Sequence, residues 1–329
     1  MHVRVSAFGR SFLSRARIQR WAPQALNNNA GCGYRLPFIF FNRASSPRSL
    51  KNMVRSAAGD HQTIISGART NVIADLKTFG ANGCYGVAAI TAIDVRERAG
   101  SVDQIYPVDV NILRACLKST LVESKVKAIK IGMLATRAHA EVVLQVIEEH
   151  SSLPVVLDPL VRASGGIDLK DTSCVEFVRD RLVPRSTVIT PNLQEAAALT
   201  ELKVEDVEDM KLAARKLIDL GARAVVVTGG HLERPVDVFA DSSNLRTLAG
   251  DRIKPENIYG AACTFSSALA ACLALGHRLD EAIILAKAYV TETIRRAYPV
   301  GDGRVPLNQL YRLQELTDAA LPSLKAAQR

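Results

Sequence analysis

Short, continuously apolar runs alternate along this chain with longer segments in which apolar residues recur at helical spacing. Runs such as Val155–Leu157 and Val225–Val227 lack polar alternation, which is typical of strands covered on both faces. The alternation predicts an α/β fold, a doubly wound and mostly parallel sheet with helices on both faces. The predicted strands are Gln62–Ser66, Val87–Thr91, Ala128–Ile131, Pro154–Leu157, Thr187–Ile189, Ala222–Thr228 and the hairpin Val236–Ala240 and Leu245–Ala249. The predicted helices are Val72–Asn82, Val110–Leu121, Ala138–His150, Thr172–Leu182, Leu193–Leu199 and Val207–Leu220.

The stretch Tyr259–Gly276 predicts a turn at Gly260–Cys263 followed by one more helix. Nearly every residue of this helix is small or apolar, so we expect it to be buried on almost all sides. The start of a buried helix directs unpaired amides and the positive end of its dipole into the interior. Such a start suits an anion, phosphate in particular. A core helix with no ligand explains the same stretch equally well.

Two carboxylates follow consecutive predicted strands. Asp158 comes directly after one strand, and Glu195 lies just beyond the next. Ligands of open α/β sheets bind at the carboxyl ends of the strands. Magnesium usually takes one or two carboxylates together with phosphate oxygens, so Asp158 and Glu195 are candidate ligands. An isolated turn at Asp158, and a capping box formed by Asn192 and Glu195, are the structural alternatives.

Two glycines end a later predicted strand, in the sequence Thr228-Gly229-Gly230-His231. Glycine lets a backbone approach a polyphosphate closely, which makes this a candidate nucleotide-binding loop. A simple turn into the following hairpin is equally consistent with the pattern.

The net charge of +9 lies in the N-terminal segment. Residues 1–59 contain ten Lys or Arg and no Asp or Glu, whereas the remainder contains 32 basic and 33 acidic residues. The near-neutral remainder argues against nucleic acid as a partner. The basic segment is typical of a transit peptide, so we expect residues 1–60 to be a transit peptide or a disordered extension, and 61–329 to form a single domain. A mitochondrial or other organellar location follows; an extension without targeting function, or a start at Met53, implies the cytoplasm.

Cysteine and hydropathy patterns argue against a zinc site, a disulfide framework and a membrane partner. The six cysteines occur without C-x-x-C or histidine pairing, which predicts reduced thiols and neither a zinc site nor a disulfide framework. No stretch reaches the roughly 20 apolar residues of a membrane span, so we expect no membrane partner.

Ordered motifs over roughly 63–310 resemble the hydroxymethylpyrimidine/phosphomethylpyrimidine kinases of thiamine synthesis, which belong to the ribokinase-like superfamily. The motifs that carry the resemblance are Ala74–Phe79, Lys130–Leu134, Thr190–Glu195, Thr228–His231 and Gly260–Ala268. Their order and spacing make chance similarity a poor explanation. The resemblance implies an enzyme of the ribokinase-like fold that uses ATP and Mg²⁺.

The resemblance also implies roles for individual residues. The Gly260–Cys263 amides would hold the transferring phosphate, and Cys263 stands where relatives carry an aspartate base. A thiol at a helix N-terminus has a lowered pKa, which permits a base role, but Cys263 is also explained as a small buried side chain. The implied site residues are Gly260, Ala261, Ala262 and Cys263 for catalysis, Asp75, Arg96, Gly132 and Met133 for substrate, Asn192, Thr228, Gly229 and Gly230 for nucleotide, and Asp158 and Glu195 for metal.

Four elements depart from the family pattern. The segment 66–73 is shorter than the family's glycine-rich loop and nearly lacks glycine. Arg96 replaces a pyrimidine-binding glutamine, and an arginine cannot accept a hydrogen bond. Thr228 replaces a lysine, and Ala261 and Ala262 replace threonine and glycine.

The resemblance implies ATP-dependent phosphoryl transfer to a hydroxymethylpyrimidine or its monophosphate in thiamine biosynthesis. The departures leave two alternatives. One is a catalytically impaired member that acts as a binding subunit. The other is a kinase for a pyridoxal-like ring, with Arg96 contacting an anionic substituent. Dimers are usual in the family, so the resemblance implies a homodimer, although the sequence itself marks no dimer surface.

Overall fold

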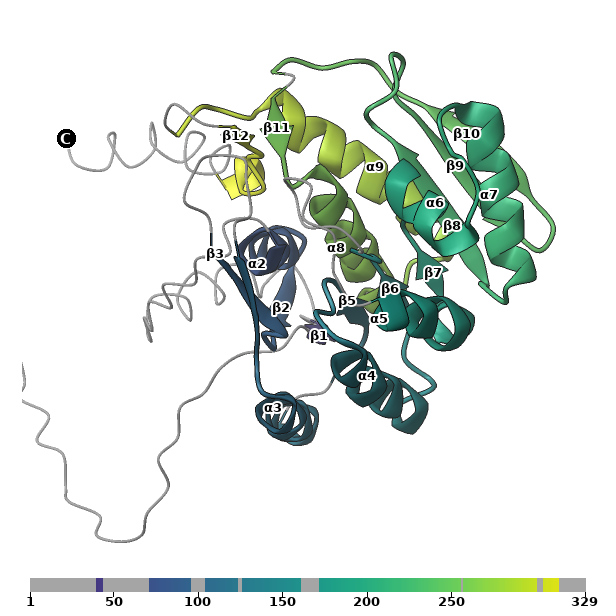
Figure 1. The fold of residues 1–329 in the computed structure, drawn as a ribbon. Coiled ribbons are helices and arrows are strands. Elements are labelled where there is room, and N and C mark those ends of the chain that lie inside the picture. Colours follow the sequence, from purple (N-terminus) through teal and green to yellow (C-terminus); the bar gives the residue numbers. More distant parts are fainter. Residues whose placement is uncertain are drawn as a thin grey trace, which may run out of the picture. The chain divides into compact units, whose positions relative to one another are not determined.

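Among the residues that the computed structural model describes, eight strands form a central sheet in the order β10-β9-β8-β7-β6-β5-β1-β2 (Figure 1). The described residues are 40–43, 71–95, 104–123, 126–160, 172–255, 257–300 and 304–313. The strands of the sheet are β1 (Phe40–Arg43), β2 (Cys84–Val87), β5 (Ile129–Ile131), β6 (Val155–Leu157), β7 (Val188–Ile189), β8 (Ala224–Gly229), β9 (Val236–Asp241) and β10 (Leu245–Ala249).

The middle of the sheet is parallel. Strands β5, β6, β7 and β8 pair in parallel, with Ile131 opposite Leu157 and Leu157 opposite Ile189. β9 and β10 continue the sheet as the predicted antiparallel hairpin. Helices connect the parallel strands, because a parallel pair needs a crossover connection. The predicted α/β fold with helices on both faces is confirmed, in a sheet that is mixed at its two ends.

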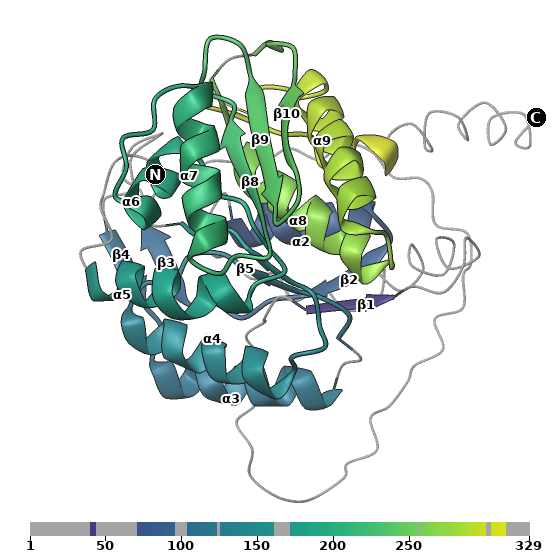
Figure 2. The same cartoon turned by 90° about the vertical axis from the view of Figure 1, so that its right-hand side faces the viewer.

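Helices cover both faces of the sheet (Figure 2), and alternate residues of the strands pack with opposite layers of helices. In β6, Val155 and Leu157 pack with the helices of one layer, and Val156 packs with those of the other. The first layer contains α3 (Val110–Glu123), α4 (Arg137–Glu149), α5 (Thr172–Phe177), α6 (Leu193–Thr200) and α7 (Val207–Asp219). The second contains α2 (Asn71–Ala81), α8 (Ala261–Ala274) and α9 (Leu279–Arg295). After α5 the chain continues through a π-helical turn, Val178–Leu182, and a 3-10 turn, Val183–Arg185.

Two short ribbons accompany the sheet. β3 (Ala92–Val95) and β4 (Gln104–Pro107) pair in antiparallel fashion, and β11 (Ile258–Tyr259) pairs in parallel with β12 (Val305–Pro306). The predicted strand Val87–Thr91 is therefore wrong in its position. The strand ends at Val87 as β2, and the chain starts a new ribbon at Ala92. The apolar run continues across both elements, so its hydropathy does not mark the break between them.

The N-terminal boundary of the fold also differs from the prediction. β1 lies inside the segment 1–60 that we expected outside the domain, and it pairs with β2 on one side and β5 on the other. The unit that contains the described residues runs from Arg35 to Arg329. The physical reason is the apolar pair Phe40–Phe41, which supplies the first half of this strand; the pair ends a run that is too short to span a membrane. The predicted strand Gln62–Ser66 falls outside the described residues.

In the part of the chain that the structure describes, no helix has both the length and the apolar composition needed to cross a bilayer.

Candidate active site

Polar residues gather at the carboxyl ends of the parallel strands. Asp158 directly follows β6, and its amide donates to the carbonyl of Ile131 in β5 over 2.8 Å. Thr190 follows β7, and its amide donates to the carbonyl of Leu157. At the end of β8, the amide of Thr228 donates to the Pro191 carbonyl over 2.8 Å. The polar residues that the sequence predicts at the carboxyl ends of the strands therefore do meet at one edge of the sheet.

Helix α8 begins at this edge, one residue after Gly260. Gly260 has φ +86°, a left-handed conformation that favours glycine, and the helix runs from Ala261. The first backbone hydrogen bond of the helix is donated by the Thr264 amide to the Gly260 carbonyl. The amides of Ala261 and Ala262 precede it, at positions whose amides have no acceptor within an α-helix. The helix therefore starts where the sequence predicted, and anion binding at this start stays a prediction.

The predicted turn at Gly260–Cys263 needs one correction. Only Gly260 belongs to the turn, and Ala261, Ala262 and Cys263 form the first turn of α8 itself. Among the described non-glycine residues, positive φ occurs at Glu201 alone. Ala262 therefore does not adopt the strained backbone that replacement of a family glycine could have required. The two alanines leave the geometry of the helix start intact.

A cleft of about 330 Å³ opens in front of this helix start. Its walls include the residues predicted for nucleotide and phosphate, namely Asn192, Thr228, Gly230 and Gly260–Cys263. Gly229 is not among the residues that line the cleft. Its amide donates to Asp237 Oδ1 over 3.1 Å, and a Cβ at this position would lie 2.2 Å from the Val236 carbonyl oxygen. Lys287 of α9 also lines the cleft and pairs with Asp237 Oδ2 at 2.5 Å.

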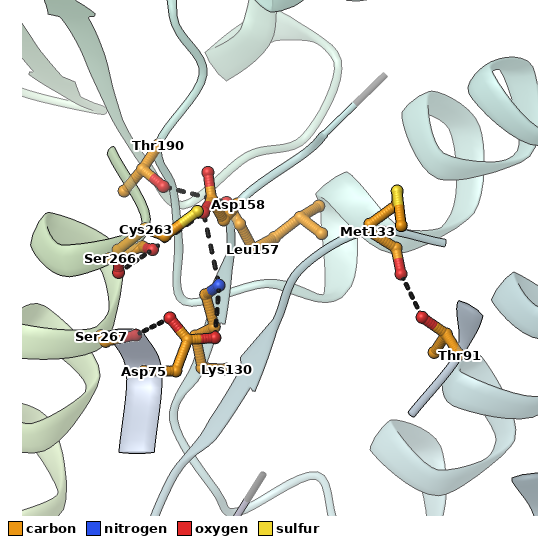
Figure 3. Close-up of polar contacts among 10 residues, drawn as sticks. All are labelled: Asp75, Thr91, Lys130, Met133, Leu157, Asp158, Thr190, Cys263, Ser266 and Ser267. Atoms are coloured by element: carbon orange, nitrogen blue, oxygen red, sulfur yellow. Dashed lines mark hydrogen bonds and ion pairs between the residues drawn. The ribbon is translucent and has the colours of Figure 1, made fainter. Parts of the chain in front are cut away.

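Behind the helix start lies a buried cluster of charges (Figure 3). Lys130 Nζ lies 3.1 Å from Asp75 Oδ2 and 3.3 Å from Asp158 Oδ2. Ser267 donates to Asp75 Oδ1 over 2.6 Å, and Ser266 Oγ lies 3.0 Å from Asp158 Oδ2. Burial opposes the charge on Lys130, but Asp75 and Asp158 outweigh it and raise the pKa of the ammonium. Lys130 is therefore a permanent cation between two acids.

One oxygen of this cluster has no partner. Asp158 has no exposed surface, and its Oδ1 is a buried side-chain atom without a hydrogen bond in the structure. Burial without a partner is costly for a carboxylate oxygen, which makes Oδ1 the natural contact for a bound cation or hydroxyl.

Glu195 interacts electrostatically with Asp158 and also caps α6. Its Oε2 accepts from the Asn192 amide over 2.8 Å, and Asn192 Oδ1 accepts from the Glu195 amide over 3.0 Å. The capping-box alternative is thus confirmed. Burial, followed by the charge of Asp158, raises the pKa of Glu195 to about 8. Because burial is the main cause, the raised pKa indicates a dry position in which the ionised form of Glu195 is disfavoured when no cation is bound.

Cys263 is buried among the same charges. Burial and then the charge of Asp158 raise the pKa of its thiol well above the ordinary value, and Lys130 offsets only part of the effect. The expected lowering of this pKa at a helix N-terminus is therefore wrong for the ligand-free chain. The dipole of the helix does not compensate for a dry, anionic environment.

The phosphomethylpyrimidine kinase family model matches residues 66–308 of the chain. The chain belongs to that family. It is 34% identical over 273 residues to the hydroxymethylpyrimidine/phosphomethylpyrimidine kinase of Streptomyces coelicolor, covering 83% of this chain and 99% of the relative. It is 35% identical over 285 residues to the thiamine biosynthesis bifunctional protein ThiED of Geobacter sulfurreducens, covering 86% of this chain but 56% of the relative.

A solved structure agrees with the family assignment. The ADP complex of Bacillus subtilis pyridoxal kinase matches with a TM-score of 0.68 and 36% sequence identity, over 73% of this chain and 92% of that one. The predicted ribokinase-like fold and a phosphotransferase activity are thereby confirmed.

The substrate side of this phosphomethylpyrimidine kinase family member is described only in part. Arg96 and most of the loop 66–73 lie outside the described residues. Gly132 and Met133 follow β5, and Thr91 Oγ1 donates to the Met133 carbonyl over 2.6 Å (Figure 3). Asp75 is buried, with one oxygen bonded to Lys130 and the other to Ser267. Its predicted contact with substrate stays a prediction, because the contacts seen for Asp75 are with the protein.

Three members of the charge cluster were not among the predicted site residues. Lys130 enters the sequence analysis only as the first residue of the motif Lys130–Leu134, although a lysine inside the apolar run Ile129–Ile131 is unusual for a strand covered on both faces. Ser266 and Ser267 are polar positions in an otherwise apolar buried helix, a second readable signal. The sequence shows that these polar residues are unusual for their apolar elements, but it does not show which residues they contact.

Proposed function

We propose that this chain transfers the γ-phosphoryl group of ATP to the hydroxymethyl group of a hydroxymethylpyrimidine, or to the phosphate of its monoester, in thiamine biosynthesis. The observation that carries the proposal is the start of α8, which lines the cleft with Gly260, Ala261 and Ala262, while Ser266 of the same helix contacts Asp158, the buried partner of Lys130. Family membership and the Streptomyces coelicolor kinase support the substrate class.

The chain's own residues account for most of what this reaction requires. Phosphoryl transfer passes through a loose transition state, so catalysis depends on positioning and on charge neutralisation more than on covalent chemistry. The amides of Ala261, Ala262 and Cys263 face the position of the transferring group, where charge that develops in the transition state is stabilised. Cys263 holds its proton in the ligand-free chain, so a base role requires the thiol pKa to fall when the ligands bind.

The carboxylates at the sheet edge fit magnesium. In the described part of the chain, no cluster of three or more His, Cys, Asp or Glu side chains would enclose a metal ion. Magnesium needs no such cage, because it binds through one or two carboxylates, water and substrate phosphates. Asp158, through its unpartnered Oδ1, and Glu195 would hold the ion. When bound, magnesium would neutralise charge on the phosphate oxygens of ATP.

A second candidate substrate is a pyridoxal-like ring. The match to the pyridoxal kinase of Bacillus subtilis, at 36% identity, favours it. Arg96 in place of a glutamine supports it as well, because a cation suits an anionic substituent better than the edge of a pyrimidine. Both candidates present a hydroxymethyl group to the same cleft, so one assay separates them.

The test uses the purified full chain with ATP, MgCl₂ and one of three acceptors: hydroxymethylpyrimidine, its monophosphate or pyridoxal. We expect acceptor-dependent ADP formation with a pyrimidine, and a loss of at least about 100-fold for Asp158→Asn. Asp219→Asn, which changes an exposed carboxylate on α7, is the matched control. Turnover with pyridoxal and with neither pyrimidine would show that the substrate is a pyridoxal-like ring instead of a pyrimidine. A melting-temperature shift with Mg-ATP but no turnover with any acceptor would favour the binding subunit.

Location and assembly form part of the same proposal. The acid-free, basic composition of residues 1–59 supports import into an organelle. Fusion of residues 1–60 to a fluorescent protein tests it, and a diffuse cytoplasmic signal would contradict it. The proposed homodimer is tested by light scattering of the full chain, where a monomeric mass would exclude it.

A further inference from the structure

The buried cluster is a closed ring that begins and ends on adjacent residues of α8. Ser267 bonds Asp75 of α2, Asp75 bonds Lys130 of β5, Lys130 pairs with Asp158 at the end of β6, and Asp158 bonds Ser266 (Figure 3). We call these five residues the α8 ring. It connects four elements that lie far apart in the sequence, and each of its members is buried.

The ring acts on the helix start that lines the cleft. Ser266 and Ser267 lie one turn after Cys263, and Ser266 Oγ is also 3.1 Å from the Cys263 carbonyl oxygen. Both contacts of Asp158 within the ring are made through Oδ2, so the ring holds this carboxylate with Oδ1 left over. Its geometry thus sets where the unpartnered oxygen lies relative to the first turn of α8.

We propose that the α8 ring is a positioning device for phosphoryl transfer: Lys130, Asp75 and Ser267 fix the separation between Asp158 and the start of α8. The proposal rests on the proposed function, because that separation matters only if both groups act on one phosphate. Asp75 is then a positioning residue whose carboxylate holds Lys130. Charge alone would not need the ring, since Lys130 neutralises either acid without Ser267.

Electrostatics favour a rigid ring over a mobile one. A buried charge without its partner is strongly unfavourable, so an arrangement that separates Lys130 from Asp75 and Asp158 is costly. The short Ser267 contact then ties this charge pair to the helix. A shift of about 1 Å between reacting groups can cost about 100-fold in rate, which makes a fixed frame valuable in a reaction governed by position.

Ser267→Ala is the mildest test of the ring. It removes the 2.6 Å contact with Asp75, leaves all charges in place and introduces a good helix former. Ser186→Ala is the matched control, because Ser186 is also fully buried and donates a 2.8 Å bond to the Leu182 carbonyl outside the ring. Asp75→Asn provides a second break in the ring on another element.

Two measurements on the full chain decide the proposal. We expect Ser267→Ala and Asp75→Asn to lower kcat by about 10- to 100-fold, with KM for ATP changed less than about twofold, because the cleft walls are untouched. We also expect N-ethylmaleimide to label Cys263 at least about fivefold faster in ligand-free Ser267→Ala, as loosening of the helix start exposes the thiol. Ser186→Ala should match the wild type in both.

Equal kcat and equal labelling in Ser267→Ala and Ser186→Ala would overturn the ring as a positioning device. Labelling of Cys263 by N-ethylmaleimide does not depend on phosphoryl transfer. If the wild-type chain phosphorylates none of the acceptors, the proposed function is overturned. Faster labelling of Ser267→Ala would in that case still support the ring as the device that fixes α8.

Discussion

Lys130 Nζ lies 3.3 Å from Asp158 Oδ2, and neither side chain has exposed surface. Lys130→Met removes the cation and leaves two buried carboxylates uncompensated. We expect a loss of about 3 to 5 kcal/mol in the free energy of unfolding, since breaking a buried pair leaves an unpaired charge. Urea denaturation measures this loss, with Lys127→Met at an exposed position as control. A loss of less than about 1 kcal/mol would show that water reaches the cluster.

A second prediction concerns β1. A chain that starts at residue 60 lacks the strand between β2 and β5, whereas a chain that starts at residue 35 keeps it. We expect the shorter chain to melt at a lower temperature and to aggregate, because two strand edges lose their partner. Calorimetry and light scattering of both fragments measure the difference. Identical melting curves would show that β1 is dispensable and would restore the boundary predicted at residue 60.

The parallel centre of the sheet could be predicted from the sequence, and with it the position of the site. Runs such as Val155–Leu157 are continuously apolar, and the carboxyl ends of parallel strands meet at one edge by geometry. Asp158, Asn192 and Thr228 were therefore placed correctly at the sheet edge from their position after a strand. The small and apolar residues of Tyr259–Gly276 predicted the helix that follows Gly260, and Gly260 lines the same cleft as Asn192 and Thr228.

The α8 ring and β1 could not be predicted in the same way. Ser267 and Asp75 are 192 residues apart, and no local pattern says which two elements will meet. The raised pKa of Cys263 arises from neighbours on other strands, so the helix position alone gave the wrong direction. Likewise, the apolar run Pro37–Phe41 carries no signal that selects β2 and β5 as its partners.

A third prediction uses the pKa of Glu195, which is raised from 4.5 to about 8. Between pH 4.5 and about pH 8, Glu195 of the folded chain keeps a proton that the unfolded chain has released. The free energy of unfolding therefore falls as the pH rises through this window. The slope due to this group is at most about 1.4 kcal/mol per pH unit. Glu195→Gln should remove this contribution and melt with a weaker pH dependence. Melts of both proteins in EDTA from pH 5 to pH 9 measure the difference, and parallel curves would contradict the raised pKa.

The last prediction separates backbone strain from function at the start of α8. Gly260 and Gly276 flank the helix with φ of +86° and +90°, and a Cβ at either position meets no atom within 4 Å. Alanine at each position therefore costs only the left-handed conformation, about 1 to 2 kcal/mol. Because the strain is the same, Gly260→Ala and Gly276→Ala should lower the free energy of unfolding equally. Only Gly260 lies in the wall of the cleft, where relief of the strain would shift the amides of Ala261 and Ala262. We expect Gly260→Ala alone to lose the melting-temperature shift caused by Mg-ADP. If both variants keep the full shift, the helix start does not hold the nucleotide phosphates.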